Sequence, residues 1–365
     1  MRVGIVGCGN ISKVYAERLG AFECLKLVAC ADLDLARAEE LVRQTGAGEV
    51  RSVEDLLGSK DIDVVVNLTI PGAHAAVARA AIAGGKSVYN EKPLALSLAE
   101  SRELLEAASR ASVRIGAAPD TFLGAGLQTC RKLIDDGAIG VPVAANGFML
   151  GAGPERWHPR PHSFYQHGAG PMFDMGPYYI TALVALLGPA RAVTSVARIT
   201  HPERPIGSEP LKGQMIKVEV PTHVATLIEL ETGAIATLVT SFDVQATNYR
   251  AIEVYGTEGT LAVPDPNSFG GPIRIRRAGE SDWREVETTH GYAEQSRGIG
   301  VADMVCAMRD DRAHRASGEL AMHVVDIMES SIEASKLARR LELSTAGVKP
   351  AALRSGIAGE AVFSA

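Results

Sequence analysis

The chain has 365 residues, of which 46% are hydrophobic and 22% charged, a composition typical of a globular protein of about two domains rather than of a disordered or fibrous chain. Its formal net charge is −6 and its 37 lysines and arginines are scattered, so we expect no nucleic-acid partner. No apolar run approaches the ~18 residues of a membrane span and no cleavable leader precedes the first strand-like run, so we expect a cytoplasmic protein that contacts no membrane.

The first third of the chain alternates short β-branched apolar runs with longer segments of helical period. This order is typical of βαβ units and predicts an NAD-binding doubly wound parallel sheet of the Rossmann type over residues 1–122. The predicted strands are Arg2–Val6, Leu25–Ala31, Val64–Thr69, Ser87–Tyr89 and Arg114–Ala117. The predicted helices are Ile11–Leu19, Leu35–Gln44, His74–Ala83 and Ser97–Ser109.

The pattern changes after residue 122: a helix over 125–136 and a strand over 142–150 precede a long loop rich in proline, histidine and aromatic residues over 151–170. Strand-like runs then follow one another directly, which predicts an α+β domain with a large, mainly antiparallel open sheet over 123–345 and a loosely held tail over 346–365. The predicted elements are strands His223–Glu231, Ala234–Val244, Tyr249–Tyr255, Leu261–Val263 and Ile273–Arg277, and helices Ile299–Arg309 and Glu319–Arg339. We expect this second domain to bind the substrate and, through the apolar face of its sheet, to form a homo-oligomer.

The five cysteines show no C-x-x-C pair and no spacing typical of metal ligands. They are Cys8, Cys24, Cys30, Cys130 and Cys306. We therefore expect reduced, mostly buried thiols and no metal site.

A glycine-rich turn, G-C-G-N-I-S from Gly7 to Ser12, links the first predicted strand to the first predicted helix. Gly7 permits the tight turn and Gly9 lets the backbone approach a pyrophosphate, which would then rest on the amides at the helix start, around Asn10 and Ile11. By itself such a turn could serve backbone geometry alone. Its place at the opening of the first βαβ unit favours dinucleotide binding.

Asp32 ends the second predicted strand, 23 residues after Gly9. This is near the spacing of about 20 residues at which an acidic side chain accepts the ribose hydroxyls of a dinucleotide. Its carboxylate would repel a ribose 2′-phosphate, and Leu33 follows it instead of an arginine. The sequence therefore predicts NAD, with NADP less favoured.

A first family resemblance lies in Thr69-Ile-Pro-Gly-Ala-His74 and in Ala83-Gly-Gly-Lys-Ser-Val-Tyr-Asn-Glu-Lys-Pro-Leu-Ala95. These segments resemble the Gfo/Idh/MocA family, named for glucose-fructose oxidoreductase, inositol dehydrogenase and a rhizopine-catabolism protein. The Glu91-Lys92-Pro93 triplet is the most specific element, and the resemblance extends to about Arg340.

A second block, Gly168-Ala-Gly-Pro-Met-Phe-Asp174-Met-Gly-Pro-Tyr178, is similar to a family pattern of three glycines followed by D-x-G-x-H. Ala169 interrupts the glycines, and Tyr178 stands where most members have histidine, which is similar to the glucose-fructose oxidoreductase branch. The resemblance implies an NAD(P)-dependent dehydrogenase that acts on a CH–OH group of a sugar, cyclitol or related polyol, and a homo-oligomer, dimer or tetramer.

Three residues are the predicted catalytic groups: Lys92, Asp174 and Tyr178. Lys92 follows a predicted parallel strand at the carboxyl edge where doubly wound sheets bind ligands, and Pro93 favours an extended backbone there. Asp174 and Tyr178 are four residues apart and would share one side of a helix. The alternative for Lys92 is a solvated lysine in a loop. Because Pro177 suits the first turn of a helix, Asp174 could instead be a helix-capping residue and Tyr178 a packing aromatic.

In the predicted reaction a hydride leaves a secondary carbinol carbon while Lys92 or Tyr178 takes the hydroxyl proton and Asp174 orients the substrate. A phenol with an ordinary pKa of about 10 is a poor base, but a neighbouring ammonium stabilises its phenolate. His158 and His162, in the preceding loop, are alternatives for the absent family histidine.

Further residues are predicted to bind the two ligands. Arg156, Trp157, His158 and Tyr165 combine hydrogen-bonding groups with aromatic faces suited to a polyhydroxylated ring, although the same loop could be a connector with incidental polar residues. The predicted cofactor contacts beyond the glycine-rich turn and Asp32 are Thr69, Pro71, His74, Glu91 and Lys92. For His74 an ordinary helix histidine is the alternative.

Two other functions stay open at this point. The resemblance also admits a redox-neutral NAD-dependent glycosidase, which oxidises one ring carbon, eliminates and returns the hydride, and a non-catalytic cofactor-sensing regulator. Net NADH formation from a free sugar would separate a dehydrogenase from the glycosidase. A regulator would bind NAD without turning over any polyol.

Overall fold

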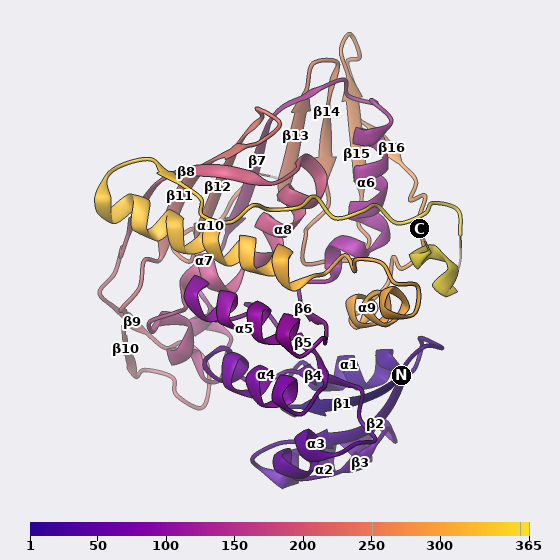
Figure 1. Ribbon diagram of the computed structural model, residues 1–365. Coiled ribbons are helices and arrows are strands. Elements are labelled where there is room, and N and C mark those ends of the chain that lie inside the picture. The colour runs from indigo at the N-terminus through magenta and orange to yellow at the C-terminus, as the bar shows by residue number, and fades with distance from the viewer. Residues whose placement is uncertain (250, 358, 365) are drawn as a thin grey trace. The chain divides into compact units, whose positions relative to one another are not determined.

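The computed structural model describes residues 1–249, 251–357 and 359–364 and divides the chain into two compact units (Figure 1). The first unit comprises Met1–Thr129, Thr288–Val325 and Pro350–Ala365, and the second comprises Cys130–Glu287 and Asp326–Lys349. The chain therefore enters the first unit three times, whereas the sequence suggested a single change near residue 122. Helices α6 (Ala125–Asp135) and α10 (Gly318–Leu337) each span a boundary between the units.

The first unit is built on a six-stranded parallel sheet of order β3-β2-β1-β4-β5-β6, which confirms the predicted doubly wound fold (Figure 1). Its central strands are apolar and buried on both faces, as parallel sheets require. The strands are β1 (Arg2–Val6), β2 (Lys26–Ala31), β3 (Glu49–Val50), β4 (Val64–Asn67), β5 (Ser87–Asn90) and β6 (Ile115–Ala117). The helices are α1 (Ser12–Leu19), α2 (Leu35–Thr45), α3 (Val53–Gly58), α4 (His74–Ala83), α5 (Leu98–Arg110) and α9 (Ile299–Arg309).

The short elements β3 and α3 were not predicted from the sequence. β3 has only two residues, too few to show the alternation of apolar and polar residues by which a strand is recognised. α3 has six residues and begins where the Ser52 side chain accepts a hydrogen bond from the Asp55 amide. A serine three residues before an aspartate is a sequence signal for a helix start, but the helix is too short for its apolar residues to show a helical period.

Helix α9 belongs to the first unit, although the sequence placed it in the second domain. Asp120, which follows β6 and is 1% exposed, accepts hydrogen bonds from the amides of Gly298 and Gly300 at 2.8 and 3.2 Å. A carboxylate at a helix start satisfies amides that have no partner within the helix and complements its dipole. Asp120 thus ties the start of α9 to the parallel sheet.

Part of the segment that the sequence suggested to be loosely held is packed against the first unit. Val362 and Phe363, in the short helix η5 (Gly359–Phe363), are fully buried. The Arg315 guanidinium donates to the carbonyls of Ala351, Ala352 and Phe363 at 3.0, 3.1 and 3.3 Å. A buried ion pair with Asp303 orients that guanidinium, so the return of the chain depends on a long-range contact.

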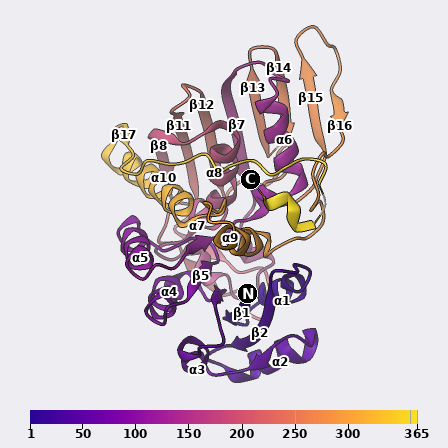
Figure 2. The same cartoon turned by 45° about the vertical axis from the view of Figure 1, so that its right-hand side comes forward.

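The second unit contains a nine-stranded sheet of order β16-β15-β14-β13-β7-β12-β11-β8-β17, in which only β7 and β12 pair in parallel (Figure 2). This confirms the predicted mainly antiparallel sheet, and the turn at Thr232-Gly233 joins β11 to β12. Helix α8, buried along its whole length, packs on β7 and β12. The strands are β7 (Pro142–Leu150), β8 (Ala190–Arg198), β11 (His223–Leu230), β12 (Ile235–Ser241), β13 (Ile252–Gly256), β14 (Gly259–Val263), β15 (Ile273–Arg277), β16 (Arg284–Val286) and β17 (Leu341–Glu342). The remaining elements are helices α7 (Gly170–Asp174) and α8 (Gly176–Leu187) and a small hairpin of β9 (Glu203–Pro205) and β10 (Met215–Lys217).

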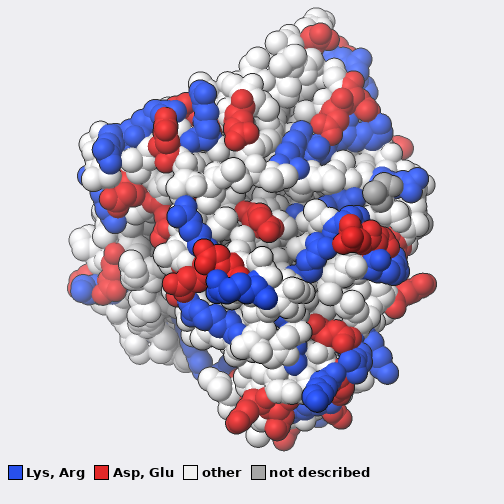
Figure 3. All heavy atoms as spheres, viewed as in Figure 1, with Lys and Arg blue, Asp and Glu red and all other residues white. Residues whose placement is uncertain are grey.

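On the face drawn in Figure 3, basic and acidic side chains are interspersed. Within residues 1–249, 251–357 and 359–364, no helix combines the length and apolar character that a membrane crossing needs.

The buried carboxyl of Asp120 predicts a specific pH dependence of stability. Burial raises its pKa to about 6, although the two amides and Arg297 act in the opposite direction. A carboxyl whose pKa is higher in the folded state than its unfolded value of about 3.9 contributes stability below about pH 4, and this contribution is lost as the pH rises through about 6. The free energy of unfolding of Asp120→Asn should therefore gain about 2 kcal/mol relative to the wild type between pH 4 and pH 7.

Urea unfolding of both proteins across this pH range measures that difference. Asp311→Asn, which changes an exposed aspartate of the same unit, is the control and should show no such trend. A difference between wild type and Asp120→Asn that stays constant with pH would contradict the assignment.

Candidate functional site

The glycine-rich turn closes against the loop that follows β4. Gly7 has φ +98°, and a Cβ there would lie 2.6 Å from the carbonyl carbon of Leu68 and the amide nitrogen of Thr69, so only glycine fits. At Gly9 nothing lies within 4 Å of the corresponding Cβ position. The first glycine therefore serves packing inside the protein, whereas the second leaves the backbone open to a ligand.

The start of α1 is formed by the same turn. The Ser12 hydroxyl and amide both contact the Gly9 carbonyl, at 2.7 and 3.1 Å. Asn10 and Ile11 lie between them, ahead of the first helical residue, and a cavity of about 370 Å³ opens beside Gly9 and Asn10 against α2. Open backbone at the start of a helix, next to such a space, fits the pyrophosphate of a dinucleotide.

Asp32 lies beside this turn with its carboxylate fixed by two backbone amides. Its Oδ2 accepts from the Cys8 amide at 2.7 Å and its Oδ1 from the Asp34 amide at 2.9 Å. Each carboxylate oxygen can accept a further hydrogen bond. The half-buried Asp32 thus holds a fixed carboxylate with remaining acceptor capacity beside the turn.

Three buried polar side chains link the loops after β4 and β5. Asn67 and Asn90 end these two strands side by side, and the Asn67 amide donates to Asn90 Oδ1 at 3.0 Å and to the His74 carbonyl at 3.1 Å. The Thr69 hydroxyl donates to Asn67 Oδ1 at 2.7 Å, and the Asn90 amide donates to the Leu94 carbonyl at 2.9 Å. Asn67, Asn90 and His74 are fully buried, so these bonds are shielded from water.

The His74 ring extends this network across the two loops. Its Nδ1 lies 2.7 Å from the Pro93 carbonyl and its Nε2 3.0 Å from the Thr69 carbonyl. Burial lowers the pKa of His74, although both carbonyls favour the protonated ring. A neutral ring carries one N–H and donates to one carbonyl, whereas the protonated ring donates to both.

Lys92 is anchored through the backbone on both of its sides. The Lys92 amide donates to Glu91 Oε2 at 2.9 Å, and the next residue, Pro93, is held by His74. The other Glu91 oxygen accepts from the hydroxyl of the buried Tyr15 on α1 at 3.0 Å. Glu91 therefore connects the helix of the glycine-rich turn to the lysine.

These contacts give His74 and Glu91 a part within the protein. The sequence assigned both to cofactor contact; the His74 ring nitrogens lie against two protein carbonyls, and the Glu91 oxygens accept from Tyr15 and Lys92. Both residues are positioned to orient the loops that carry Thr69 and Lys92. Thr69 and the exposed Pro71 lie in the loop after β4, because this strand ends at Asn67 and not at Thr69 as predicted.

In the second unit, Tyr165 does not have the accessibility predicted for a substrate contact. It is fully buried, and its hydroxyl donates to the Glu155 carboxylate, which in turn pairs with Arg204 at 2.9 Å. Burial first, and then Glu155, raise the pKa of Tyr165. Arg204 also pairs with Asp243, so Tyr165 belongs to a buried ionic cluster that fixes the loop after β7.

The other predicted substrate residues of this loop are accessible. Trp157 is 69% exposed, and the exposed Arg156 donates to Gln245 Oε1 at 2.6 Å. The half-buried His158 ring contacts Trp157 and Phe164 edge to face. These three residues keep surfaces that a ligand could contact.

Asp174 and Tyr178 lie on two consecutive helices, not on one as predicted. Asp174 is the last residue of α7, and Tyr178 is in the first turn of α8, which begins after Met175. In a continuous helix Pro177 would lack an amide and its ring would clash with the carbonyl of residue 173. A new helix, α8, therefore begins here, with Pro177 in its first turn and with Met175, not Asp174, at its capping position.

Comparison with known proteins gives the same two-part organisation. Residues 1–118 match the "Oxidoreductase family, NAD-binding Rossmann fold" and residues 127–262 match the "GFO/IDH/MocA C-terminal domain". Inositol 2-dehydrogenase 3 of Saccharopolyspora erythraea is 29% identical over 295 residues, covering 78% of this chain and 80% of that protein. The 1,5-anhydro-D-fructose reductase of Ensifer adhaerens is 30% identical over 269 residues, covering 71% and 74%. The chain belongs to the GFO/IDH/MocA oxidoreductase family.

A solved structure shares the fold of this GFO/IDH/MocA protein. An NAD binding oxidoreductase from Klebsiella pneumoniae superposes with a TM-score of 0.83 at 24% identity, covering 95% of this chain and 100% of that one. With the family established, the protein is an NAD(P)-dependent oxidoreductase whose residues 1–118 match the family's NAD-binding fold. The open turn at Gly9 and the oriented carboxylate of Asp32 fit that cofactor.

Sequence reasoning missed Asn67 and Asn90 in this GFO/IDH/MocA domain. Each is a polar residue at the end of an otherwise apolar strand, in V-V-V-N and S-V-Y-N, and the pairing of β4 with β5 places them side by side. Two such endings on neighbouring parallel strands were a usable signal, because a buried amide needs a partner.

The His74 contacts predict a positioning role that mutation can test. His74→Ala removes the link between the Thr69 and Pro93 carbonyls and should lower kcat by up to about 100-fold, with a smaller effect on the Kd for NAD. Steady-state kinetics measure the change in kcat, and titration with NAD measures the change in Kd. His314→Ala is the control, because His314 is also buried in the first unit and contacts a carbonyl, that of Ile115 at 3.1 Å.

Both variants should lose about 1–3 kcal/mol in the free energy of unfolding. Only His74→Ala should lose turnover in the protein that remains folded. Equal kcat losses in the two variants would assign His74 to stability alone.

Proposed function

We propose that the protein is an NAD-dependent dehydrogenase that oxidises a secondary hydroxyl of a sugar, cyclitol or related polyol. The observation that carries the proposal is the backbone of Lys92, fixed by Glu91 on one side and by the His74–Pro93 contact on the other, at the carboxyl edge of β5. In doubly wound folds this edge is where ligands bind. An inositol dehydrogenase and an anhydrofructose reductase among the relatives support a polyhydroxylated substrate.

The first unit would hold the cofactor through the groups described above. Backbone amides from Gly9 to Ile11 would take the pyrophosphate, because the Gly7 and Cys8 amides already donate to the Ala31 carbonyl and to Asp32, and Asp32 would accept the ribose hydroxyls. Thr69 and Pro71 would flank the nicotinamide half, held in place by the Asn67 and His74 contacts. Bound NAD supplies the hydride acceptor.

The proton chemistry is assigned to Lys92 and Tyr178. The Lys92 ammonium would hold the substrate hydroxyl, and the phenol of Tyr178 would take its proton as the carbinol carbon is oxidised. Asp174 would orient the substrate or its neighbours. Arg156, Trp157 and His158 are the proposed ring contacts, and Tyr165 leaves this set because it is buried against Glu155.

A homo-oligomer is part of the proposal. Val196, Leu227 and Ile235 lie on the same face of neighbouring strands β8, β11 and β12 and are 71%, 48% and 50% exposed. Adjacent exposed apolar side chains on one sheet face are typical of an interface between subunits. The cytoplasmic location expected from the sequence stays a prediction.

Replacing the two proposed catalytic groups tests the reaction. Lys92→Met and Tyr178→Phe should each lower kcat/KM by about 10²–10⁴-fold while NAD still binds, since each removes a proton-handling group. Tyr179→Phe is the matched control: it removes a neighbouring phenol that donates to the Phe148 carbonyl at 3.3 Å and should leave kcat/KM nearly unchanged.

NADH absorbance with a panel of sugars, inositols and glycosides provides the measurement. A Lys92→Met variant that turns over substrate at the wild-type rate would show that the lysine has no part in the mechanism. Glycoside cleavage without net NADH would indicate a redox-neutral glycosidase, and NAD binding without any turnover would indicate a regulator. Either result would overturn the dehydrogenase assignment.

Asp32 predicts the cofactor preference. Wild-type enzyme should prefer NAD over NADP, and Asp32→Asn, which keeps the shape of the side chain but removes its charge, should reduce this preference by about 10-fold or more. Parallel kinetics with both cofactors measure the ratio. Asp34→Asn, a change of the neighbouring exposed aspartate that pairs with Arg37 at 3.4 Å, is the control. A wild-type preference for NADP, or an unchanged ratio in Asp32→Asn, would refute the prediction.

A further inference from the structure

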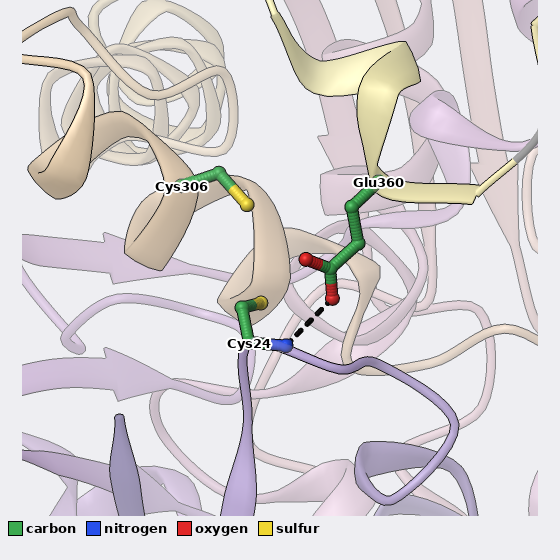
Figure 4. Close-up of side chains that lie close together, drawn as sticks. All are labelled: Cys24, Cys306 and Glu360. Atoms are coloured by element: carbon green, nitrogen blue, oxygen red, sulfur yellow. Dashed lines mark hydrogen bonds between the residues drawn. The ribbon is translucent and has the colours of Figure 1, made fainter.

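Three potential metal ligands from distant parts of the chain meet in the first unit. Cys24 lies in the loop between α1 and β2, Cys306 on α9 and Glu360 in η5. One ligand atom from each lies within 4.8 Å of the others, and Figure 4 shows the two sulfur atoms and the carboxylate directed toward one another. Cys24 and Cys306 are 282 residues apart, so their spacing gave no sign of this cluster.

We propose that Cys24, Cys306 and Glu360 form a binding site for one zinc-like divalent cation. Two thiolates and a carboxylate are ligands that zinc takes in proteins, at about 2.3 Å for sulfur and about 2.0–2.2 Å for oxygen. Neighbouring ligand atoms around a tetrahedral zinc are then roughly 3.3–3.8 Å apart. The ligand atoms lie within 4.8 Å of one another, so the longest of these separations would need to contract by roughly 1–1.5 Å to reach this geometry.

The carboxylate of Glu360 is already oriented for such a role. Its Oε1 accepts a hydrogen bond from the Cys24 amide at 2.7 Å, and its other oxygen is directed toward the sulfur atoms (Figure 4). A ligand held by a hydrogen bond from outside the metal shell loses less freedom when it binds. The half-buried setting of Cys24 and Glu360 admits water as a fourth ligand.

The segments that carry the ligands are held independently of any metal. The Tyr292 ring stacks between Phe22 and Phe363, with centroid distances of 5.9 and 6.1 Å, and thereby joins the Cys24 loop to η5. Arg315 binds carbonyls of the same C-terminal segment. The site is therefore preorganised, and metal binding would fasten the end of the chain to the dinucleotide-binding unit.

The binding step conserves charge and protons. The two thiol protons leave to solvent as the cation forms two metal–sulfur bonds and one metal–oxygen bond, with no change in oxidation state. The resulting site has a structural role, and it includes none of the residues proposed for hydride or proton transfer. Loss of the metal should lower stability more than activity.

The test uses the full chain without a metal-binding tag, with zinc content measured by mass spectrometry after dialysis against zinc and with Co²⁺ as an optical probe. The wild type should hold about one zinc per chain and should give the thiolate charge-transfer and intense visible bands of tetrahedral cobalt. Cys24→Ala and Cys306→Ala should each weaken zinc binding by more than about 100-fold. Glu360→Gln, a gentler change in a half-buried residue, should weaken zinc binding in a chain that still folds.

Cys30→Ala is the matched control, because Cys30 is a buried cysteine of the same unit outside the cluster. It should keep one zinc and the cobalt spectrum. Zinc content in the wild type no higher than in Cys24→Ala would overturn the proposal. A Cys24–Cys306 disulfide in protein purified under reducing conditions would also overturn it.

Discussion

The buried hydrogen bonds among Asn67, Asn90 and His74 are the constraint on which the rest of the site depends. They tie together the loops that leave two neighbouring parallel strands, where each loop would otherwise be free to move. The Asn67 amide donates to Asn90 and to the His74 carbonyl, and the His74 ring lies between the Pro93 and Thr69 carbonyls, so this network favours one arrangement of the loops. The position of Lys92, and with it the proposed chemistry, follows from that arrangement.

Features that depend on local chain geometry could be predicted from the sequence. The tight turn at Gly7, the position of Asp32 directly after β2 and the placement of Lys92 after β5 all depend on residues within a few positions of one another. The alternation of strands and helices likewise predicts the parallel sheet, because each βαβ unit closes before the next begins. The sheet of the second unit follows from strands in direct succession.

Features that depend on contacts between distant segments could not be predicted in this way. Tyr165 looked like a pocket aromatic, but it is buried because Arg204, on a later strand, brings an ion pair to Glu155. The return of the C-terminal segment to the first unit rests on Arg315, and that return brings Glu360 to Cys24 and to Cys306 of α9. Such contacts have no period or spacing in the sequence.

The central proposal is that Lys92 and Tyr178 act on the same substrate hydroxyl over a bound nicotinamide. A crystal structure of the protein with NAD and a polyol tests this most directly through two distances, from Lys92 Nζ and from Tyr178 Oη to the nearest substrate oxygen. The account predicts that both atoms lie about 3 Å from one and the same hydroxyl. Lys92 and Tyr178 in separate cavities, or a substrate oxygen that neither atom reaches, would contradict it.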